Sequence, residues 1–487
     1  MVRRESDRCI VPLKLDNSSS RTKPGNAGAG KASKLSREQV VPPTAHSGES
    51  LVFSRLERIT NRAEQHPEEA FNNLFTLLNV ELLRMAFDRL ERNKAPGVDG
   101  RTVVDYEANL ESNLQDLEQR LHRGSYRPLP SLRRDIPKGA GKTRPLGIAA
   151  VEDKLVQRAV VMILERIYEV DFCESSFGFR PGRSCHDALG VLGKIIATKK
   201  VNWISDADIK GFFDNVNHEQ LVELLRTRIG DPRMLQLIER FLKAGVMIEG
   251  RRHETEDGVP QGAVLSPLLA NVYLHYILDQ WFERDVKPRL KGEAHLVRYA
   301  DDFICAFETE ADAKRFQEVL VKRLGRYSLE LALEKTKLLR FGRFAERDSA
   351  RLGEGRPGVF DFLGFTHYCG HSRAGKFKLK RRTSKKKMRA KLRDMTDWLR
   401  SQLTVPIAEV WPILNAKLRG HYQYYGINDN WPQLIKYQRL VERLSFRWMR
   451  RRSHKGKTHS WSNFREFVQQ HPLALPRKLT DLIALYR

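Results

Sequence analysis

The stretch from Leu296 to Phe307 places two adjacent carboxylates, Asp301 and Asp302, between apolar segments rich in branched and aromatic residues. Such flanks are typical of strands, so the stretch predicts two strands joined by a tight acidic turn. Neighbouring carboxylates repel each other and lose hydration beside apolar strands, and a divalent cation compensates both effects. The stretch therefore indicates either a magnesium site on a β-hairpin or an ordinary solvated turn, in which Asp is common.

The order strand, helix, hairpin, helix, strand around this stretch predicts an α+β sheet with helices on one face. Ser266 is expected to be the N-cap of the helix before the hairpin, with Pro267 in its first position. Ser184 is likewise expected to cap a helix, and an amphipathic helix is expected over 311–324. Further helices are predicted from the apolar spacing between 51 and 90, over 103–123 and over 151–170.

The composition of the 487 residues favours an anionic partner. Lys and Arg number 86 against 60 Asp and Glu, a formal net charge of +26, which points to nucleic acid. No apolar run approaches the roughly 18 residues that a membrane-spanning helix needs, and no signal peptide is recognisable, so we expect no membrane partner and a cytoplasmic location. The five cysteines are scattered without a Cys-x-x-Cys pair, which predicts neither a disulfide framework nor a zinc module.

A third carboxylate, Asp208, lies near the end of the strand expected at 201–209. Phosphoryl transfer with two metal ions needs carboxylates on rigid backbone, with the ions about 3.5–4 Å apart. Because neighbouring strands lie about 4.8 Å apart, Asp208 and Asp301, each expected to end a strand, can reach one pair of ions. Asp302 is expected to point elsewhere or to help at the edge of this site.

A basic segment offers a place for phosphate. Two strands joined by a Gly-rich turn would present Lys138, Lys142 and Arg144 together. Ammonium and guanidinium groups bind phosphate, and Arg does so with two parallel hydrogen bonds. Near the C-terminus, the basic run from Arg450 to Lys457 predicts either phosphate contact or a solvated loop.

Several blocks occur in a fixed order: Ala207 to Asp214, Gly258 to Pro267, Tyr299 to Asp302, and Phe362 to Phe365. In this order they resemble reverse transcriptases of bacterial mobile group II introns, which also act as maturases. The blocks at 93–100, 144–147 and 177–184 are similar to the same family, and the resemblance covers about residues 51 to 480. It implies an α+β right-hand polymerase, with fingers and palm, followed by a helical thumb and maturase domain.

The resemblance also implies a division of the chain. It implies an N-terminal extension and fingers at 51–200, a palm at 201–365, a thumb and maturase domain at 366–450 and a basic nucleic-acid-binding segment at 451–487. Residues 1–50 are rich in Ser, Gly, Pro, Lys and Arg without an apolar period, and this composition predicts a flexible basic tail. Many members of the family carry a Cys/His-rich endonuclease at the C-terminus, and no cysteine follows Cys369 here. The type without an endonuclease is therefore expected, with priming at nicks or replication-fork strands.

Metal and nucleotide roles follow from the same resemblance. Asp208, Asp301 and Asp302 would be the palm carboxylates that hold two Mg²⁺ ions, with Ile209 as a further metal ligand. Lys138 and Arg144 would hold the incoming triphosphate. Phe213 would be the bulky aromatic that excludes the ribose 2′-hydroxyl, with a plain core aromatic as the alternative. Gln261 and Gly262 would line the templating base pair, where a side chain at Gly262 would collide.

Two lysines and a histidine complete the candidates around the site. Lys337 resembles the palm lysine near the leaving pyrophosphate, although Lys335 is equally well placed. His218 is expected to be an ordinary residue at a helix N-terminus.

The resemblance of the region after Phe365 implies binding of structured RNA by a basic helical surface, dominated by shape and phosphate contacts. The candidate RNA-binding residues are Lys378, Lys380, Arg381, Arg382, Lys385, Lys386, Lys387, Arg450, Arg451 and Arg452.

The expected function is that of an RNA-directed DNA polymerase that copies intron RNA into DNA and binds the intron to promote splicing and mobility. Its expected partners are structured intron RNA, primer and target DNA, and dNTPs, which would bring it to the bacterial nucleoid. One alternative is a domesticated reverse transcriptase in repair or phage defence. Another is an RNA-binding splicing factor without polymerase activity.

Overall fold

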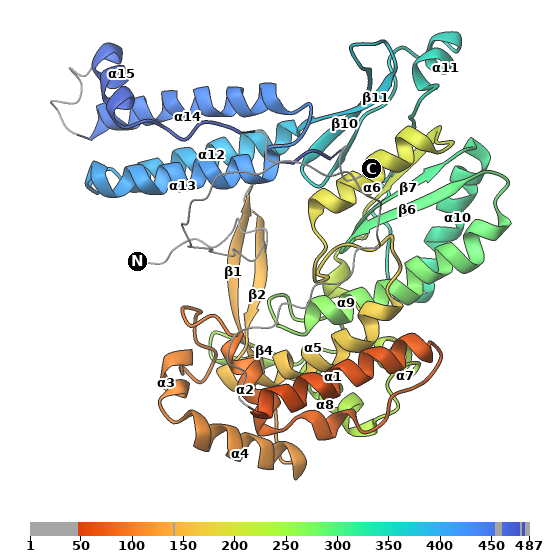
Figure 1. Cartoon of the computed structure of the whole chain (residues 1–487), viewed down its shortest axis with the longest axis vertical. Helices are drawn as coiled ribbons and strands as arrows, with labels where there is room; N and C mark the ends of the chain where they lie inside the picture. The colour runs from red at the N-terminus through yellow and green to blue at the C-terminus, as the bar shows by residue number, and fades with distance from the viewer. Residues whose placement is uncertain (1–46, 140–141, 453–459, 478–479, 483–487) are drawn as a thin grey trace, which may run out of the picture.

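The structure is a computed structural model that describes residues 47–139, 142–452, 460–477 and 480–482 (Figure 1). Side chains of 47–50, 137–139 and 142 are not among those described. The basic tail predicted at 1–50 therefore lies almost entirely outside the described residues. The same holds for residues 453–457 of the basic run near the C-terminus.

The N-terminal part of the described chain is helical, as the apolar spacing predicts. Leu56 and Leu83, from the first two α-helices, are buried with Leu155 of a long central helix. The single helix expected over 103–123 is wrong, because Asn109 leaves the helical region (φ −127°, ψ 39°) and divides it in two. The helices of this part are α1 (Ser47–Gln65), η1 (Leu74–Leu77), α2 (Val80–Asp88), α3 (Val103–Glu107), α4 (Leu110–His122), α5 (Val151–Asp171), α7 (His218–Arg226) and α8 (Pro232–Leu242).

A long hairpin projects from this helical part toward the C-terminal helices (Figure 1). It consists of β1 (Ser131–Gly139) and β2 (Lys142–Ile148), so the two strands predicted around the basic turn are confirmed. β1 also pairs with β4 (Val246–Ile248), which in turn pairs with β5 (Arg251–His253). The resulting sheet has the order β2-β1-β4-β5.

A second sheet contains the predicted acidic hairpin. β6 (Ala294–Tyr299) and β7 (Asp302–Phe307) pair antiparallel. β7 also pairs with β3 (Trp203–Ala207), and β3 pairs with β8 (Lys337–Arg340), so the order is β6-β7-β3-β8. The strand that precedes Asp208 therefore lies directly beside the acidic hairpin.

Both faces of this sheet are covered, so the expectation of helices on one face is wrong. Phe303 and Phe307 belong to the apolar cluster formed with α9 (Ser266–Leu274) and α10 (Glu310–Arg326). Ile304 and Ala306 belong to the cluster on the other face, with Leu189 of α6 (Cys185–Thr198). The residues of β7 after its first are apolar without alternation, which is the pattern of a strand buried on both faces. α9 continues as two π-helical segments, η3 (His275–Gln280) and η4 (Phe282–Val286), followed by a short 3-10 helix, η5 (Lys287–Arg289).

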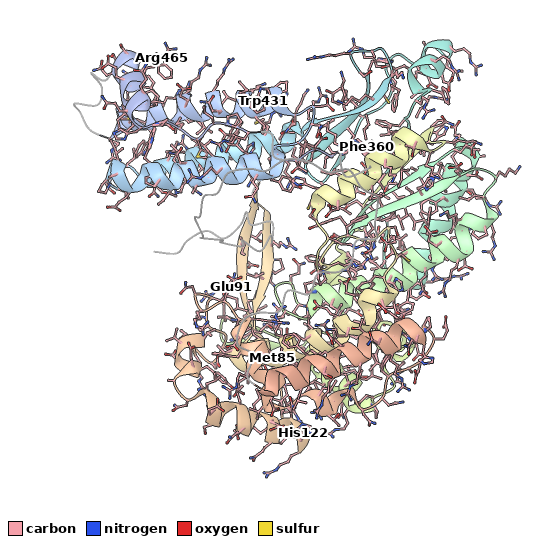
Figure 2. The ribbon with its side chains drawn as sticks, in the orientation of Figure 1. Met85, Glu91, His122, Phe360, Trp431 and Arg465 are labelled. Atoms are coloured by element: carbon pink, nitrogen blue, oxygen red, sulfur yellow. The ribbon has the colours of Figure 1, made fainter. Side chains whose placement is uncertain are left out.

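Beyond β8, the C-terminal region consists of a short helix, then a small antiparallel sheet of order β11-β10-β9, and then further helices. The sheet spans the position between residues 365 and 366 where a domain boundary is expected. Phe360, labelled in Figure 2, belongs to the apolar cluster that joins α6 to this sheet. No helix in the described part of the chain combines the length and apolarity needed to cross a bilayer. The elements of this region are α11 (Ala345–Arg351), β9 (Phe360–Phe362), β10 (Phe365–His371), β11 (Phe377–Thr383), α12 (Lys385–Ser401), α13 (Ile407–Tyr425), α14 (Trp431–Arg451) and α15 (Trp461–Gln470).

Candidate active site

Carboxylates meet at one end of the second sheet. Asp208 follows the last residue of β3 directly, and Asp302 is the first residue of β7. The two strands pair antiparallel, with Ala207 opposite Phe303. Continuing this register brings Asp208 opposite Asp302. Because alternate strand residues face the same side, both side chains lie on the face that also carries Asp206.

The acidic turn supplies another carboxylate. Tyr299 pairs with Asp302, which leaves Ala300 and Asp301 as a two-residue turn. The predicted hairpin is confirmed, but the expectation that Asp301 ends a strand is wrong, because β6 ends two residues earlier. Asp302 was expected to point elsewhere or to help at the edge of the site, and it lies near enough to Asp301 and Asp208 for their charges to act on it.

Partial loss of hydration and like charge raise two carboxyl pKa values at this end of the sheet. The Asp302 side chain is exposed, but the protein around it displaces part of its hydration, and this loss, followed by the charges of Asp301 and Asp208, raises its pKa to about 6. Loss of hydration also raises the pKa of Asp206 to about 7, an effect that the Lys337 charge opposes and the Asp302 charge reinforces. A bound cation would relieve this repulsion, so the group has the electrostatics of a cation site.

Arg298, one residue before Tyr299, anchors the acidic turn from within the protein. It is fully buried, and its Nε donates to Asp279 Oδ1 at 2.8 Å. Its Nη1 donates to the Ala300 carbonyl at 2.9 Å and to Asn271 Oδ1 at 3.0 Å. Sequence reasoning missed this ion pair. The available signal was a charged residue inside an apolar strand, since buried charges are almost always paired.

A loop between α5 and α6 presses on the same turn. Ala300 has a φ of 57°, in the left-handed region that side chains disfavour. A Cβ atom on Gly178 would lie 2.2 Å from the Ala300 nitrogen, so only glycine allows this close approach. Asn271 Nδ2 donates to the Gly178 carbonyl at 2.7 Å.

The N-cap predicted for α6, the helix after this loop, is confirmed. The Ser184 side chain accepts a hydrogen bond there in a complete capping box.

The structure distinguishes two lysines that the sequence left equivalent. Lys335 forms an ion pair and a hydrogen bond with Asp208. Lys337 is the first residue of β8 and pairs in register with Asp206. Lys335 is therefore the lysine in direct contact with a predicted metal ligand, and Lys337 lies beside a neighbouring carboxylate.

Hydrogen bonds join the residues predicted to contact the nucleotide. Arg144 on β2 donates from Nε to Gln261 Oε1 at 2.6 Å. Gln261 donates from Nε2 to Asp214 Oδ1 at 2.9 Å, and Asp214 is next to Phe213. The structure thus brings Arg144 and Gln261 to the segment that follows Asp208. The Lys138 side chain lies outside the described residues, although its backbone belongs to β1.

The loop before α9 is shaped by packing within the protein. Gly262 has a φ of 101°, and a Cβ atom there would lie 2.6 Å from Leu146 Cδ1 and 2.9 Å from the Gly147 oxygen. The collision expected at Gly262 therefore arises even without a template. The expectation that Ser266 is an N-cap is wrong, because α9 begins at Ser266 and its hydroxyl donates to the Pro260 carbonyl at 2.8 Å.

Phe213 and His218 both follow Asp208 in the chain, and their burial and contacts can be compared with their predicted roles. Phe213 is half-buried at the edge of the core, and its ring centroid lies 5.3 Å from that of Phe212. It is therefore neither a fully buried core residue nor fully exposed. His218 is the first residue of α7, and its Nε2 is hydrogen-bonded with the Gly258 carbonyl at 2.6 Å. The expectation of a helix N-terminal residue is confirmed.

The donors at the sheet end fit a hard divalent cation that completes its coordination elsewhere. Asp208 and Asp302 offer carboxylate oxygens from opposed positions at the strand ends, and the carbonyl of Ile209, the next residue, is a further backbone oxygen there. Within the described ranges, no three His, Cys, Asp or Glu side chains are arranged as a metal site by themselves. Magnesium usually binds one or two carboxylates and completes its shell with water and substrate phosphates, so this donor set fits.

The candidate RNA-binding residues have unequal surroundings. Lys385–Lys387 are exposed in the first turn of α12. The charge of Lys387 is among those that lower the pKa of Asp302, so α12 begins near the carboxylates. Lys378 instead forms an ion pair with Asp429 at 2.7 Å.

Strand β11 separates its basic residues between two faces. Arg381 is only 4% exposed and donates from Nη2 to the Leu189 carbonyl of α6 at 2.7 Å. Its expected RNA contact is corrected, since this guanidinium is used to hold β11 against α6. Lys380 and Arg382 are half-exposed, and the Arg382 guanidinium lies 5.3 Å from the Tyr368 ring centroid.

The end of α14 carries a basic and aromatic surface. Arg450 and Arg451 are exposed, and Arg452 is half-buried. The Arg450 guanidinium lies 5.7 Å from the Phe446 ring centroid, and that of Arg452 lies 4.7 Å from the Trp448 centroid. Cation–π contacts of this kind leave the outward edge of a guanidinium able to meet phosphate.

Comparison with known proteins matches the site to a family. The family described as reverse transcriptase (RNA-dependent DNA polymerase) matches residues 136–367, which include the carboxylates described above. The group II intron-encoded protein LtrA of Lactococcus lactis subsp. cremoris is 36% identical over 303 residues, 60% of this chain and 50% of LtrA. Protein YkfC of Escherichia coli (strain K12) is 37% identical over 274 residues, 50% of this chain and 72% of YkfC.

A more distant relative comes from a plant. Nuclear intron maturase 2, mitochondrial, of Arabidopsis thaliana is 28% identical over 176 residues, 28% of this chain and 24% of the relative. The chain thus spans about half the length of LtrA and a smaller part of the plant protein.

Proposed function

Because this chain belongs to the reverse transcriptase family, we propose that it is an RNA-directed DNA polymerase that extends a primer with deoxynucleotides. The observation that carries the proposal is the meeting of Asp208, Asp301 and Asp302 at one end of a sheet, beside the segment joined to Arg144 and Gln261. The test is extension of a DNA primer on an RNA template by the purified chain with dNTPs and Mg²⁺. DNA product is expected, and absence of extension would overturn the proposal.

Each residue has a proposed part in the reaction. Asp208 and Asp301, with Asp302 and the Ile209 carbonyl, would hold two Mg²⁺ ions. Bound ions of this kind activate the attacking hydroxyl and stabilise charge on the attacking and leaving oxygens. Arg144 would orient the triphosphate through its guanidinium.

The remaining nucleotide contacts are proposed around the same segment. Lys138 would join Arg144 at the triphosphate, and Gln261 with Gly262 would line the base pair. Phe213 would lie under the sugar and exclude a 2′-hydroxyl. Lys337 would lie near the leaving pyrophosphate, while Lys335 would leave Asp208 when metal binds.

We propose a role for each successive part of the chain. Residues 51–200, with the β1–β2 hairpin, would act as N-terminal extension and fingers, and 201–365 as the palm. Residues 366–450 would form a thumb and maturase domain, and 451–487 would add nucleic-acid contacts. The support is the order of the elements and the helical character of the C-terminal region (Figure 1).

The proposed RNA partner is a structured group II intron, whose splicing and mobility the chain would promote. The support is the similarity to an intron-encoded protein and to an intron maturase, together with the net charge of +26 and the exposed Lys385–Lys387. Splicing of the cognate intron RNA in vitro, with and without the chain, tests this part. A domesticated enzyme of repair or phage defence would share the polymerase residues and fail this assay.

Lys335→Met is expected to tighten binding of Mn²⁺ to the free protein by a factor of about 1.4 to 5, because an exposed ion pair contributes roughly 0.2–1 kcal/mol. The Lys335 ammonium group is paired with the Asp208 carboxylate, so a metal ion must displace this ammonium group before it can bind Asp208. Electron paramagnetic resonance of unbound Mn²⁺ measures the affinity. Lys210→Met is the matched control, since Lys210 pairs with Glu330 and its side chain is 61% exposed, against 62% for Lys335. Equal Mn²⁺ affinity of Lys335→Met and the wild-type protein would contradict the exchange.

Replacing Lys385–Lys387 together by alanine is expected to weaken RNA binding and to reduce the slope of log affinity against log salt by about two to three, at roughly 0.7–0.9 per lost phosphate contact. Affinity measured across a salt series gives the slope. The control replaces Arg315 and Lys322, exposed on α10 at the back of the sheet. An unchanged slope in the α12 variant would show that these lysines are only a solvated surface.

A further inference from the structure

Phe179 is an exposed aromatic residue at the edge of the candidate active site. Its side chain is 41% exposed, whereas large aromatic residues are mostly buried. Its ring meets that of Phe213 edge to face, with centroids 6.5 Å apart and planes at 88°. This is a favourable aromatic geometry, and it connects the loop before α6 to the segment after Asp208.

The loop holds Phe179 in a conformation that its side chain disfavours. Its φ is 58°, which is uncommon for a bulky residue and persists only when the surroundings fix it. The residues on either side provide this fixation. Gly178 is pressed against Ala300, and Arg180 is buried with its Nε donating to Glu169 Oε2 at 3.0 Å.

Further bonds close the loop on itself. Arg180 Nη1 donates to the carbonyl oxygens of Cys173 and Ser176, both at 2.9 Å. The Phe177 nitrogen donates to the Arg298 carbonyl at 2.9 Å, which adds the loop to the edge of β6. The loop is thus anchored by its backbone and by Arg180, and the Phe179 ring is not needed to hold it.

We propose that Phe179 is a positioning residue that fixes the ring of Phe213 and thereby sets how strongly a ribose 2′-hydroxyl is rejected. The inference rests on the proposed function, in which Phe213 lies under the sugar. Phe213 packs on the buried Phe212 from the core side, with planes at 71°, and on Phe179 from the exposed side. With both neighbours present, its ring has little freedom to tilt.

The consequence is specific to the sugar. Without Phe179, the Phe213 ring gains room to tilt and the surface that collides with a 2′-hydroxyl recedes. A deoxynucleotide has no group at that position, so its use changes little. A loop that merely collapsed would instead lower the use of both kinds of nucleotide, because Gly178 and Ala300 couple the loop to the acidic turn.

The experiment measures kcat/KM for dCTP and for CTP on one primer and RNA template. Phe179→Ala is expected to lower the dCTP preference about two- to tenfold, as an aromatic pair of about 0.5–1.5 kcal/mol implies. The kcat for dCTP should stay within about twofold of the wild-type value. Phe179→Tyr, which keeps the ring, should restore the preference. Phe344→Ala is the matched control, since that residue is 44% exposed and lies immediately before α11, outside the loop and the segment that carry Phe179 and Phe213.

A double-mutant cycle with Phe213→Ala tests whether Phe179 acts through Phe213. Adding Phe179→Ala to Phe213→Ala should change the preference no further. Additive losses, or an equal fall in kcat/KM for both nucleotides in Phe179→Ala, would overturn the inference. An unchanged preference in Phe213→Ala would instead refute the proposed role of Phe213, and a wild-type chain that extends no primer would refute the polymerase proposal.

Discussion

Asp208→Asn should lower the rate of primer extension by about a thousandfold or more, because a bound metal supplies several kcal/mol of charge stabilisation and each 1.36 kcal/mol is tenfold. The amide keeps the shape of the side chain and removes the charge that opposes Asp302 across the strands. Asp301→Asn should cause a loss of similar size. Single-turnover extension with Mg²⁺ measures the chemical step, and RNA affinity measured in parallel should be nearly unchanged.

The matched control is Glu330→Gln. Glu330 lies beside the same strand end, where its carbonyl accepts from the Lys210 nitrogen at 2.8 Å and its side chain pairs with Lys210. Its carboxylate is 68% exposed, and removing it should change extension by less than about threefold. Extension by Asp208→Asn at the rate of the Glu330 variant would refute the metal assignment.

Local patterns were sufficient to predict the elements that carry the carboxylates. The branched and aromatic residues before Asp208 and around Asp301 and Asp302 predict strands at the positions of β3, β6 and β7. The prediction that Asp301 ends a strand was wrong. The geometry of the turn depends on contacts with Gly178 and Arg298, which the local sequence does not reveal.

Contacts between distant parts of the chain could not be predicted in this way. Arg144 and Gln261 are 117 positions apart, and Lys335 and Asp208 are 127 apart. The burial of Arg381 depends on where α6 lies, and α6 covers the sheet face that was expected to be free of helices. Composition identifies a residue as basic, but only packing determines whether it meets solvent or a backbone carbonyl.

Arg298→Met should lower the free energy of unfolding by about 3–5 kcal/mol, because removing one partner of a buried ion pair leaves the charge of the other partner without compensation. Arg298 and Asp279 are both fully buried, and the variant leaves the Asp279 carboxylate in place. A lower midpoint of thermal unfolding at neutral pH is the measurement. Replacing both residues, as Arg298→Met with Asp279→Leu, should recover a large part of the loss because no buried charge remains.

The pH dependence distinguishes an uncompensated charge from a simple packing defect. Burial raises the pKa of Asp279, and Arg298 opposes that rise, so its removal should raise the pKa further. A carboxyl whose pKa is higher in the folded state binds a proton there first, so stability increases as pH falls toward the unfolded pKa of about 3.9. The deficit of Arg298→Met relative to the wild-type protein should therefore shrink between neutral pH and about pH 5. A deficit that does not change with pH would mean that Arg298 stabilises the sheet by its shape and not by its charge. The double variant should lack this pH dependence and still extend primers slowly, because the Ala300 carbonyl of the acidic turn has lost its donor.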